Sequence, residues 1–118
     1  MNKMKFPSKE GSTYRDDSSF DHYQEWAETT AVYQDNLYPV LALAEEAGEL
    51  AGKFAKALRA GTNFNKEAVA KELGDVLWNV ALIASELGMT LSDIAIMNFN
   101  KIESRKARGV INGEGDNR

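Results

Sequence analysis

Residues 71–88 read KELGDVLWNVALIASELG, a segment that is apolar in almost every direction around a helix axis. A helix that is apolar nearly all round is buried by its neighbours. One narrow stripe is nevertheless polar, because Glu72, Asp75 and Asn79 stack at helical spacing and Glu86 extends them. Two buried carboxylates need a cation, a proton or a basic partner. The segment therefore predicts a central helix that carries a functional site, with a structural ion pair as the alternative.

A second acidic helix is predicted for residues 39–60, where Pro39 suits the first position and a glycine follows the end. A broad apolar face runs along it, and the segment EEAGE at 45–49 lies beside that face. Its acids are Glu45, Glu46 and Glu49. They repel one another unless a positive charge lies among them. A solvated face with Glu49 paired to Lys53 is the structural alternative.

An antiparallel hairpin of these two helices would bring four carboxylates together as oxygen ligands. The four are Glu46, Glu49, Glu72 and Asp75. Such a cluster suits Mg²⁺ or Mn²⁺, which keep open positions for water and substrate phosphates. The chain has no cysteine, so thiolate sites are excluded. A ferritin-like di-iron site is disfavoured because it uses Glu-x-x-His pairs, and the single histidine, His22, does not follow a glutamate at that spacing.

Two more helices complete an all-α, four-helix bundle, and no strand is expected. The first begins after Ser18 or Ser19 as cap, and the fourth runs over residues 91–107 behind a Thr90–Asp93 capping box. The third helix, capped by Asn65, is predicted to end at residue 87. We expect one domain at 18–118, a flexible N-terminal arm at 1–17 and a flexible C-terminal tail after the last helix.

The fourth helix supplies the charge opposite to that of the acids. Asn98, Lys101 and Arg105 fall on one face of it. Basic side chains beside a metal cluster are what a polyphosphate requires, because they neutralise the oxygens that the metal does not bind. The alternative is a basic helix C-terminus that simply favours the helix dipole.

The composition and charge of the chain limit the kinds of ligand and surface that it is expected to bind. The net charge of −4 argues against a duplex nucleic-acid binder, whereas a bound cation can reverse the local sign for a small phosphate ligand. No segment is long and apolar enough to span a membrane, and residues 1–9 lack the apolar core of a secretory signal. A cytoplasmic location is therefore expected.

Four ordered blocks resemble the MazG-like nucleoside triphosphate pyrophosphohydrolases, an all-α superfamily. EEAGE at 45–49 and ELGD at 72–75 match the pattern E-x-x-E…E-x-x-D. NFNKIESRKARGVINGEGDNR at 98–118 is similar to the ending of single-domain MazG-like proteins, and DHYQEWAETTAVY at 21–33 also has the look of that family. The resemblance covers about residues 19–118.

The resemblance implies Mg²⁺-dependent hydrolysis of nucleoside triphosphates, with a preference for deoxyribonucleotides, to monophosphate and pyrophosphate; Mn²⁺ is a possible substitute. It implies that the metal ligands are Glu46, Glu49, Glu72 and Asp75. Glu45 would be an outer acid or the base that activates water. Substrate contacts would come from Asn98, Lys101 and Arg105, with Asn79 near the site. The family also implies a homodimer or homotetramer with sites near subunit interfaces.

Two other functions are compatible with the sequence. One is a non-catalytic helical oligomer that binds nucleotides, and the other is a related pyrophosphohydrolase that acts on phosphoribosyl-ATP or on the alarmone ppGpp. The residues themselves leave the preferred base and sugar open, and only the resemblance favours deoxyribonucleotides. Aromatic residues at helical spacing usually belong to a core, although any of four is able to stack on a base: Trp26, Tyr33, Phe54 and Trp78.

Overall fold

The computed structural model describes residues 6–7, 14–15 and 19–115 of the 118-residue chain. Its helices are α1 (Phe20–Thr29), α2 (Tyr38–Ala60), α3 (Lys66–Glu86) and α4 (Leu91–Arg108). The prediction of an all-α fold with four helices is confirmed. The structure adds a short antiparallel pair that the sequence pattern did not predict, β1 (Phe6–Pro7) with β2 (Tyr14–Arg15). The rest of the predicted arm, like residues 116–118 of the tail, lies outside the described residues.

The predicted caps fix where the helices begin. The Ser19 hydroxyl accepts the N–H of His22 at 3.3 Å, and the side-chain oxygen of Asn65 accepts the N–H of Ala68 at 3.1 Å. Thr90 and Asp93 form both halves of a capping box. The helix boundaries fall within one residue of those predicted from the sequence, since α2 starts at residue 38, α3 ends at 86 and α4 ends at 108.

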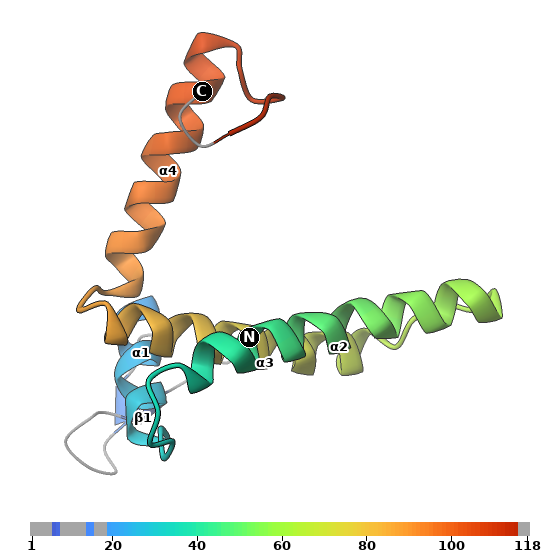
Figure 1. The fold of residues 1–118 in the computed structure, drawn as a ribbon, viewed down its shortest axis with the longest axis horizontal. Helices are drawn as coiled ribbons and strands as arrows, with labels where there is room; N and C mark the ends of the chain where they lie inside the picture. Colours follow the sequence, from blue (N-terminus) through green and yellow to red (C-terminus); the bar gives the residue numbers. More distant parts are fainter. Residues whose placement is uncertain (1–5, 8–13, 16–18, 116–118) are drawn as a thin grey trace.

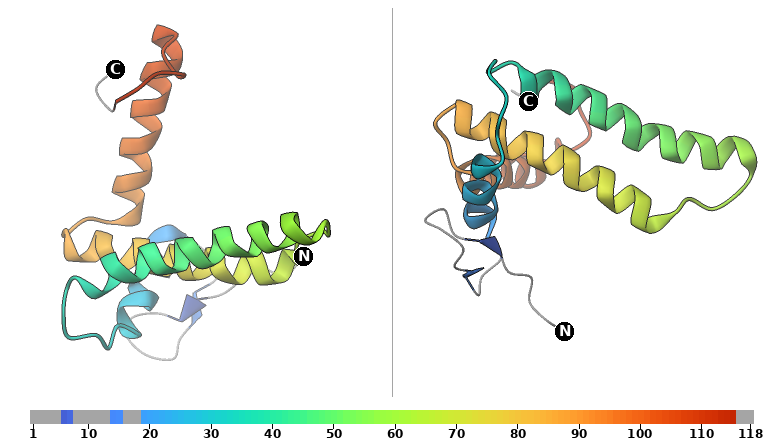
Figure 2. Two further views of the ribbon diagram at one scale, coloured as in Figure 1. Left: turned by 45° about the vertical axis from the view of Figure 1, so that its right-hand side comes forward. Right: turned by 90° about the horizontal axis from the view of Figure 1, so that it is seen from below.

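The two long helices form the antiparallel hairpin that the sequence predicts. Figure 2 shows α2 and α3 side by side along most of their length, with α1 across one end. Gly61 ends α2 with a left-handed φ of 67°, a conformation that costs glycine little, and the chain then turns back into α3. The hairpin is the element that positions the acids.

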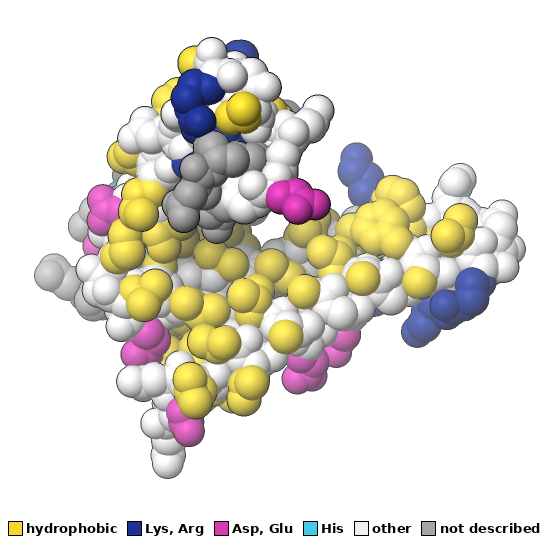
Figure 3. Space-filling view, turned by 45° about the horizontal axis from the view of Figure 1, so that its top comes forward, with side chains coloured by type: hydrophobic (Ala, Val, Ile, Leu, Met, Phe, Trp, Pro, Cys, Tyr) yellow, Lys and Arg dark blue, Asp and Glu magenta, His cyan; other side chains and the backbone are white. Residues whose placement is uncertain are grey.

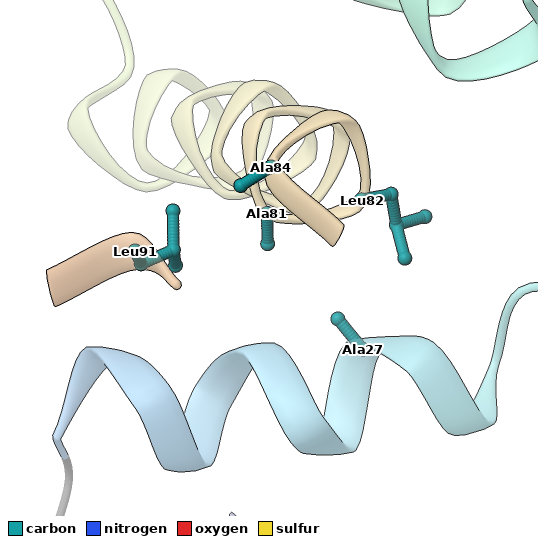
Figure 4. Packing of buried hydrophobic residues seen from close by; sticks show 5 residues of the cluster. All are labelled: Ala27, Ala81, Leu82, Ala84 and Leu91. Carbon is teal, nitrogen blue, oxygen red and sulfur yellow. The ribbon is translucent and has the colours of Figure 1, made fainter. Parts of the chain in front are cut away.

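The buried core is small and rich in alanine. Its fully packed residues come from α1, α3 and the start of α4 (Figure 4), and they are Ala27, Ala81, Leu82, Ala84 and Leu91. Alanine lets α1 approach α3 closely but buries little apolar area. Because α2 and most of α4 contribute no residue to this core, much of their apolar surface stays exposed in the single chain.

One buried glutamine ties α1 to the turn between α3 and α4. The Gln24 amide nitrogen donates to the carbonyl oxygen of Met89 at 2.9 Å and to the hydroxyl of Ser85 at 3.0 Å. Its side-chain oxygen accepts the N–H of Leu91 at 2.9 Å. These bonds fix the start of α4, which leaves α3 at 99° (Figure 1). Among the described residues, α4 contacts α1 and α3 but not α2.

No single helix in 19–115 is long and apolar enough to cross a membrane. The bent pair α3 and α4 meets the criterion by length and composition when the two helices are taken together.

Candidate metal centre

Three acids from the two hairpin helices converge on one point. Glu72 and Asp75 project from neighbouring turns of α3, and the antiparallel α2 brings Glu46 against them. One carboxylate oxygen of each residue lies within 4.8 Å of the other two. Three of the four carboxylates that the hairpin was expected to bring together are therefore adjacent.

The surroundings of the Glu46 carboxyl group disfavour its negative charge. Its pKa is raised to about 7, first by burial, then by a hydrogen bond with Glu72 and by the negative charges of Glu49, Asp75 and Glu72. The Oε2 atoms of Glu46 and Glu72 are buried and have no hydrogen-bond partner among the described residues. Orphaned oxygens in an all-oxygen donor set fit a hard divalent cation such as Mg²⁺.

Glu49, the fourth predicted ligand, lies beside this group and not within it. Its side chain is exposed and lines a cavity of about 340 Å³ together with Gly52, Lys53 and Lys56. Its charge still contributes to the raised pKa of Glu46, so the two carboxyl groups are close enough to interact. Glu45 is exposed as well.

Lys53 lies next to the acid cluster, a position that the sequence pattern did not predict. The sequence offered a pair with Glu49 on the same helix as the structural alternative, whereas the structure pairs Lys53 across the hairpin, with its Nζ 3.7 Å from Oε1 of Glu72. This ammonium group partly neutralises the carboxylates from within the same chain. The sequence does show that Lys53 follows Glu46 by two turns of α2. Only the register of the hairpin brings this side chain against Glu72 on α3.

Asn79 is buried one turn beyond Asp75 on α3. It is 2% exposed, and its amide nitrogen donates to the backbone carbonyl of Asp75 at 3.0 Å. Its Oδ1 atom is buried without a hydrogen-bond partner among the described residues. Asn79, which is expected near the site from the sequence, lies on the same helix as two of the acids.

The predicted substrate contacts on α4 lie apart from the acids within one chain, because α4 turns away from the hairpin and does not contact α2 in the described part of the fold. Asn98 and Lys101 border a largely apolar cavity of about 550 Å³ at the base of α4. Arg105 is 4% exposed, and its guanidinium donates to the carbonyl oxygen of Gly115 at 3.3 Å. The described part of the C-terminal tail thus folds back on α4.

The chain is similar in sequence to known proteins. It is 43% identical over 111 residues to the Gene 37 protein of Mycobacterium phage L5, a match that covers 83% of this chain and 97% of that protein. No solved structure gives a significant match. The model of the MazG nucleotide pyrophosphohydrolase domain matches residues 34–110, which include α2, α3 and α4 and therefore every predicted site residue. The chain belongs to the MazG nucleotide pyrophosphohydrolase domain family.

Proposed function

We propose that this protein hydrolyses nucleoside triphosphates, with a preference for deoxyribonucleotides, to nucleoside monophosphate and pyrophosphate in the presence of Mg²⁺ or Mn²⁺. The observation that carries the proposal is the group of three carboxylates within 4.8 Å, two of which have one buried oxygen with no hydrogen-bond partner in the described part of the chain. Membership of the family supports the general reaction class. The expected site of action is the cytoplasm.

Glu46, Glu72 and Asp75 would hold the cation, with Glu49 at its open side. A bound divalent cation neutralises phosphate charge and lowers the pKa of the attacking water. The raised pKa of Glu46, about 7, favours its protonated form below neutral pH, and a cation held by these carboxylates would favour the deprotonated form. Glu45, which is exposed, is proposed to serve as an outer acid or as the base that takes a proton from water.

The basic face of α4 would reach a site in a second copy of the chain. We propose a homodimer or homotetramer in which Asn98, Lys101 and Arg105 of one protomer lie over the acids of its partner. The support is the separation of α4 from α2 in one chain, together with the apolar side chains that extend along the hairpin toward α4 in Figure 3. Burial of such a surface is the usual driving force for association.

A substrate panel tests the reaction. Standard and modified nucleoside triphosphates, deoxyribonucleoside triphosphates, phosphoribosyl-ATP and ppGpp are incubated with Mg²⁺ or Mn²⁺, and monophosphate, pyrophosphate and orthophosphate are resolved. We expect monophosphate and pyrophosphate from nucleoside triphosphates, and no product with EDTA. Fastest turnover of phosphoribosyl-ATP or ppGpp would favour the related enzymes, and binding without turnover would favour a nucleotide-binding oligomer.

A further inference from the structure

An aromatic cavity lies where the hairpin meets the segment between α1 and α2. Its volume is about 440 Å³, within the range of small-ligand sites. The lining residues are Val32, Tyr33, Gln34, Asp35, Tyr38 and Trp78. Three of the six are aromatic, and all six lie outside the acid cluster.

The aromatic walls are held in place by contacts from several elements. The rings of Tyr33 and Tyr38 stack with centroids 5.7 Å apart and an interplanar angle of 23°. The Tyr33 hydroxyl donates to Oε1 of Glu86 at 2.9 Å, and the indole nitrogen of Trp78 donates to the hydroxyl of Thr30 at 2.8 Å. These bonds orient the rings before any ligand arrives, which lowers the entropic cost of stacking.

The cavity lies next to the acids along both hairpin helices. Trp78 follows Asp75 by three residues, about 4.5 Å along α3, and Tyr38 precedes Glu46 by eight residues, about 12 Å along α2. Because the helices are antiparallel, both displacements run toward the same end of the hairpin. If the phosphates of a nucleotide lie at the acids, its base lies in one of two directions along the hairpin. One direction leads to this cavity, and the other leads to the loop between α2 and α3.

We propose that this cavity binds the nucleobase of the substrate, an inference that rests on the proposed function of the acid cluster. Aromatic side chains stack on any base because every base has a π face. Gln34, which is exposed at the cavity wall, offers both a donor and an acceptor to a base edge. Asp35 accepts the N–H of Leu37 at 2.9 Å and thereby shapes the loop that carries Gln34.

A binding measurement tests the cavity without turnover. The indole N–H resonances of Trp78 and Trp26 are followed by NMR as nucleosides without phosphate are added to the metal-free, full-length protein. We expect the Trp78 resonance to shift more than that of Trp26. Tyr38→Leu should remove the shift. Equal shifts of both resonances, or no shift up to the solubility limit of every nucleoside, would overturn the proposal.

Kinetics give a second test that separates the base from the phosphates. Tyr38→Leu should raise KM for the preferred nucleoside triphosphate about tenfold, because loss of stacking on one base has an effect of this size. Inhibition by pyrophosphate, which has no base, should be unchanged. Phe54→Leu is the matched control, since Phe54 is another exposed aromatic on α2 and stacks against Phe64 at 4.7 Å near the hairpin loop.

The two tests distinguish failure of this inference from failure of the proposed function. If the wild-type protein turns over nucleotides while Tyr38→Leu keeps a wild-type KM and Trp78 does not shift, the cavity is not the base site. If nucleosides shift Trp78 but no nucleotide is hydrolysed, the base site stands and the proposed reaction fails. A larger KM in Phe54→Leu than in Tyr38→Leu would move the base site to the loop end of the hairpin.

Discussion

Glu46 links the stability of the metal-free protein to pH. Its pKa in the folded protein, about 7, is above the ordinary value of 4.5, so the folded state binds the proton more tightly than the unfolded chain. That contribution to stability is fully present below the ordinary pKa and is lost as pH rises to about 7. We therefore expect Tm, measured in EDTA, to fall between about pH 5 and pH 8 more steeply for the wild type than for Glu46→Gln.

If the three carboxylates bind Mg²⁺ as proposed, magnesium should reverse that trend, because the bound cation would take the place of the proton. With saturating Mg²⁺, the wild type should gain stability as pH rises through 7, while Glu46→Gln gains less. Identical pH profiles for the two proteins in EDTA would show that Glu46 does not share a proton in the folded state.

A second prediction separates metal binding from folding at Glu72. Glu72→Gln should lower turnover by more than about 100-fold, since it removes a proposed cation ligand, and should remove most of the thermal stabilisation by Mg²⁺. Glu67→Gln is the control because Glu67 is an exposed glutamate on the same helix, paired only with Lys71 at 3.6 Å among the ion pairs found in the described residues. Circular dichroism should show both variants folded. Near-normal turnover in Glu72→Gln would exclude this metal site.

The sequence pattern placed Glu72 and Asp75 together on one helix, but it did not predict the lysine beside Glu72. The spacing of Glu72 and Asp75 on a buried helix is a local property, so it is visible without a structure. The ion pair between Lys53 and Glu72 depends on the register of two helices, which local spacing does not define. For the same reason, the position of Glu49 beside the three-acid group and not within it could not be deduced from its place on α2.

For the helices, local sequence features predict where each one begins, whereas long-range hydrogen bonds set the direction of α4. The caps at Ser19, Asn65 and Thr90 act within three residues of themselves and were predicted. The direction of α4 depends on Gln24, which reaches the turn after α3 from α1. Nothing in the periodicity of α1 distinguishes a buried glutamine from an exposed one.

A substitution at Gln24 measures how much its hydrogen bonds contribute to the stability of the fold. Gln24→Ala should lower the free energy of unfolding by about 2 kcal/mol, because it leaves the buried N–H of Leu91 and the partly buried carbonyl of Met89 without their partner. Gln34→Ala is the control, since that glutamine is exposed, and it should change the free energy by less than about 0.5 kcal/mol. Urea unfolding measures both. Equal effects would mean that the Gln24 bonds contribute little to holding α4.

The described helices form an open arrangement with a small core. This shape decides whether the acids of the hairpin and the basic residues of α4 come together within one chain. In a closed four-helix bundle, the basic face of the fourth helix would lie opposite the acids, as the sequence pattern predicts. In the structure α4 stands away from the hairpin, and large apolar side chains such as Leu58, 83% exposed, and Phe99, 64% exposed, remain uncovered. Local periodicity predicts that these faces are apolar, but it does not tell whether the same chain or a second copy covers them.

Mixing two inactive variants decides whether the site is shared between copies. If the acids of one protomer work with Lys101 of its partner, a heterodimer of Asp75→Asn and Lys101→Ala chains has one site with both mutations and one site with none. Random pairing then restores about a quarter of wild-type sites, whereas sites contained within one chain stay inactive in every pairing. The measurement is turnover after the variants are mixed under conditions that allow subunit exchange, with each variant alone as the control. Recovery near a quarter would establish a shared site; no recovery, with exchange shown independently, would place the acids and Lys101 in the same chain and require α4 to close over the hairpin.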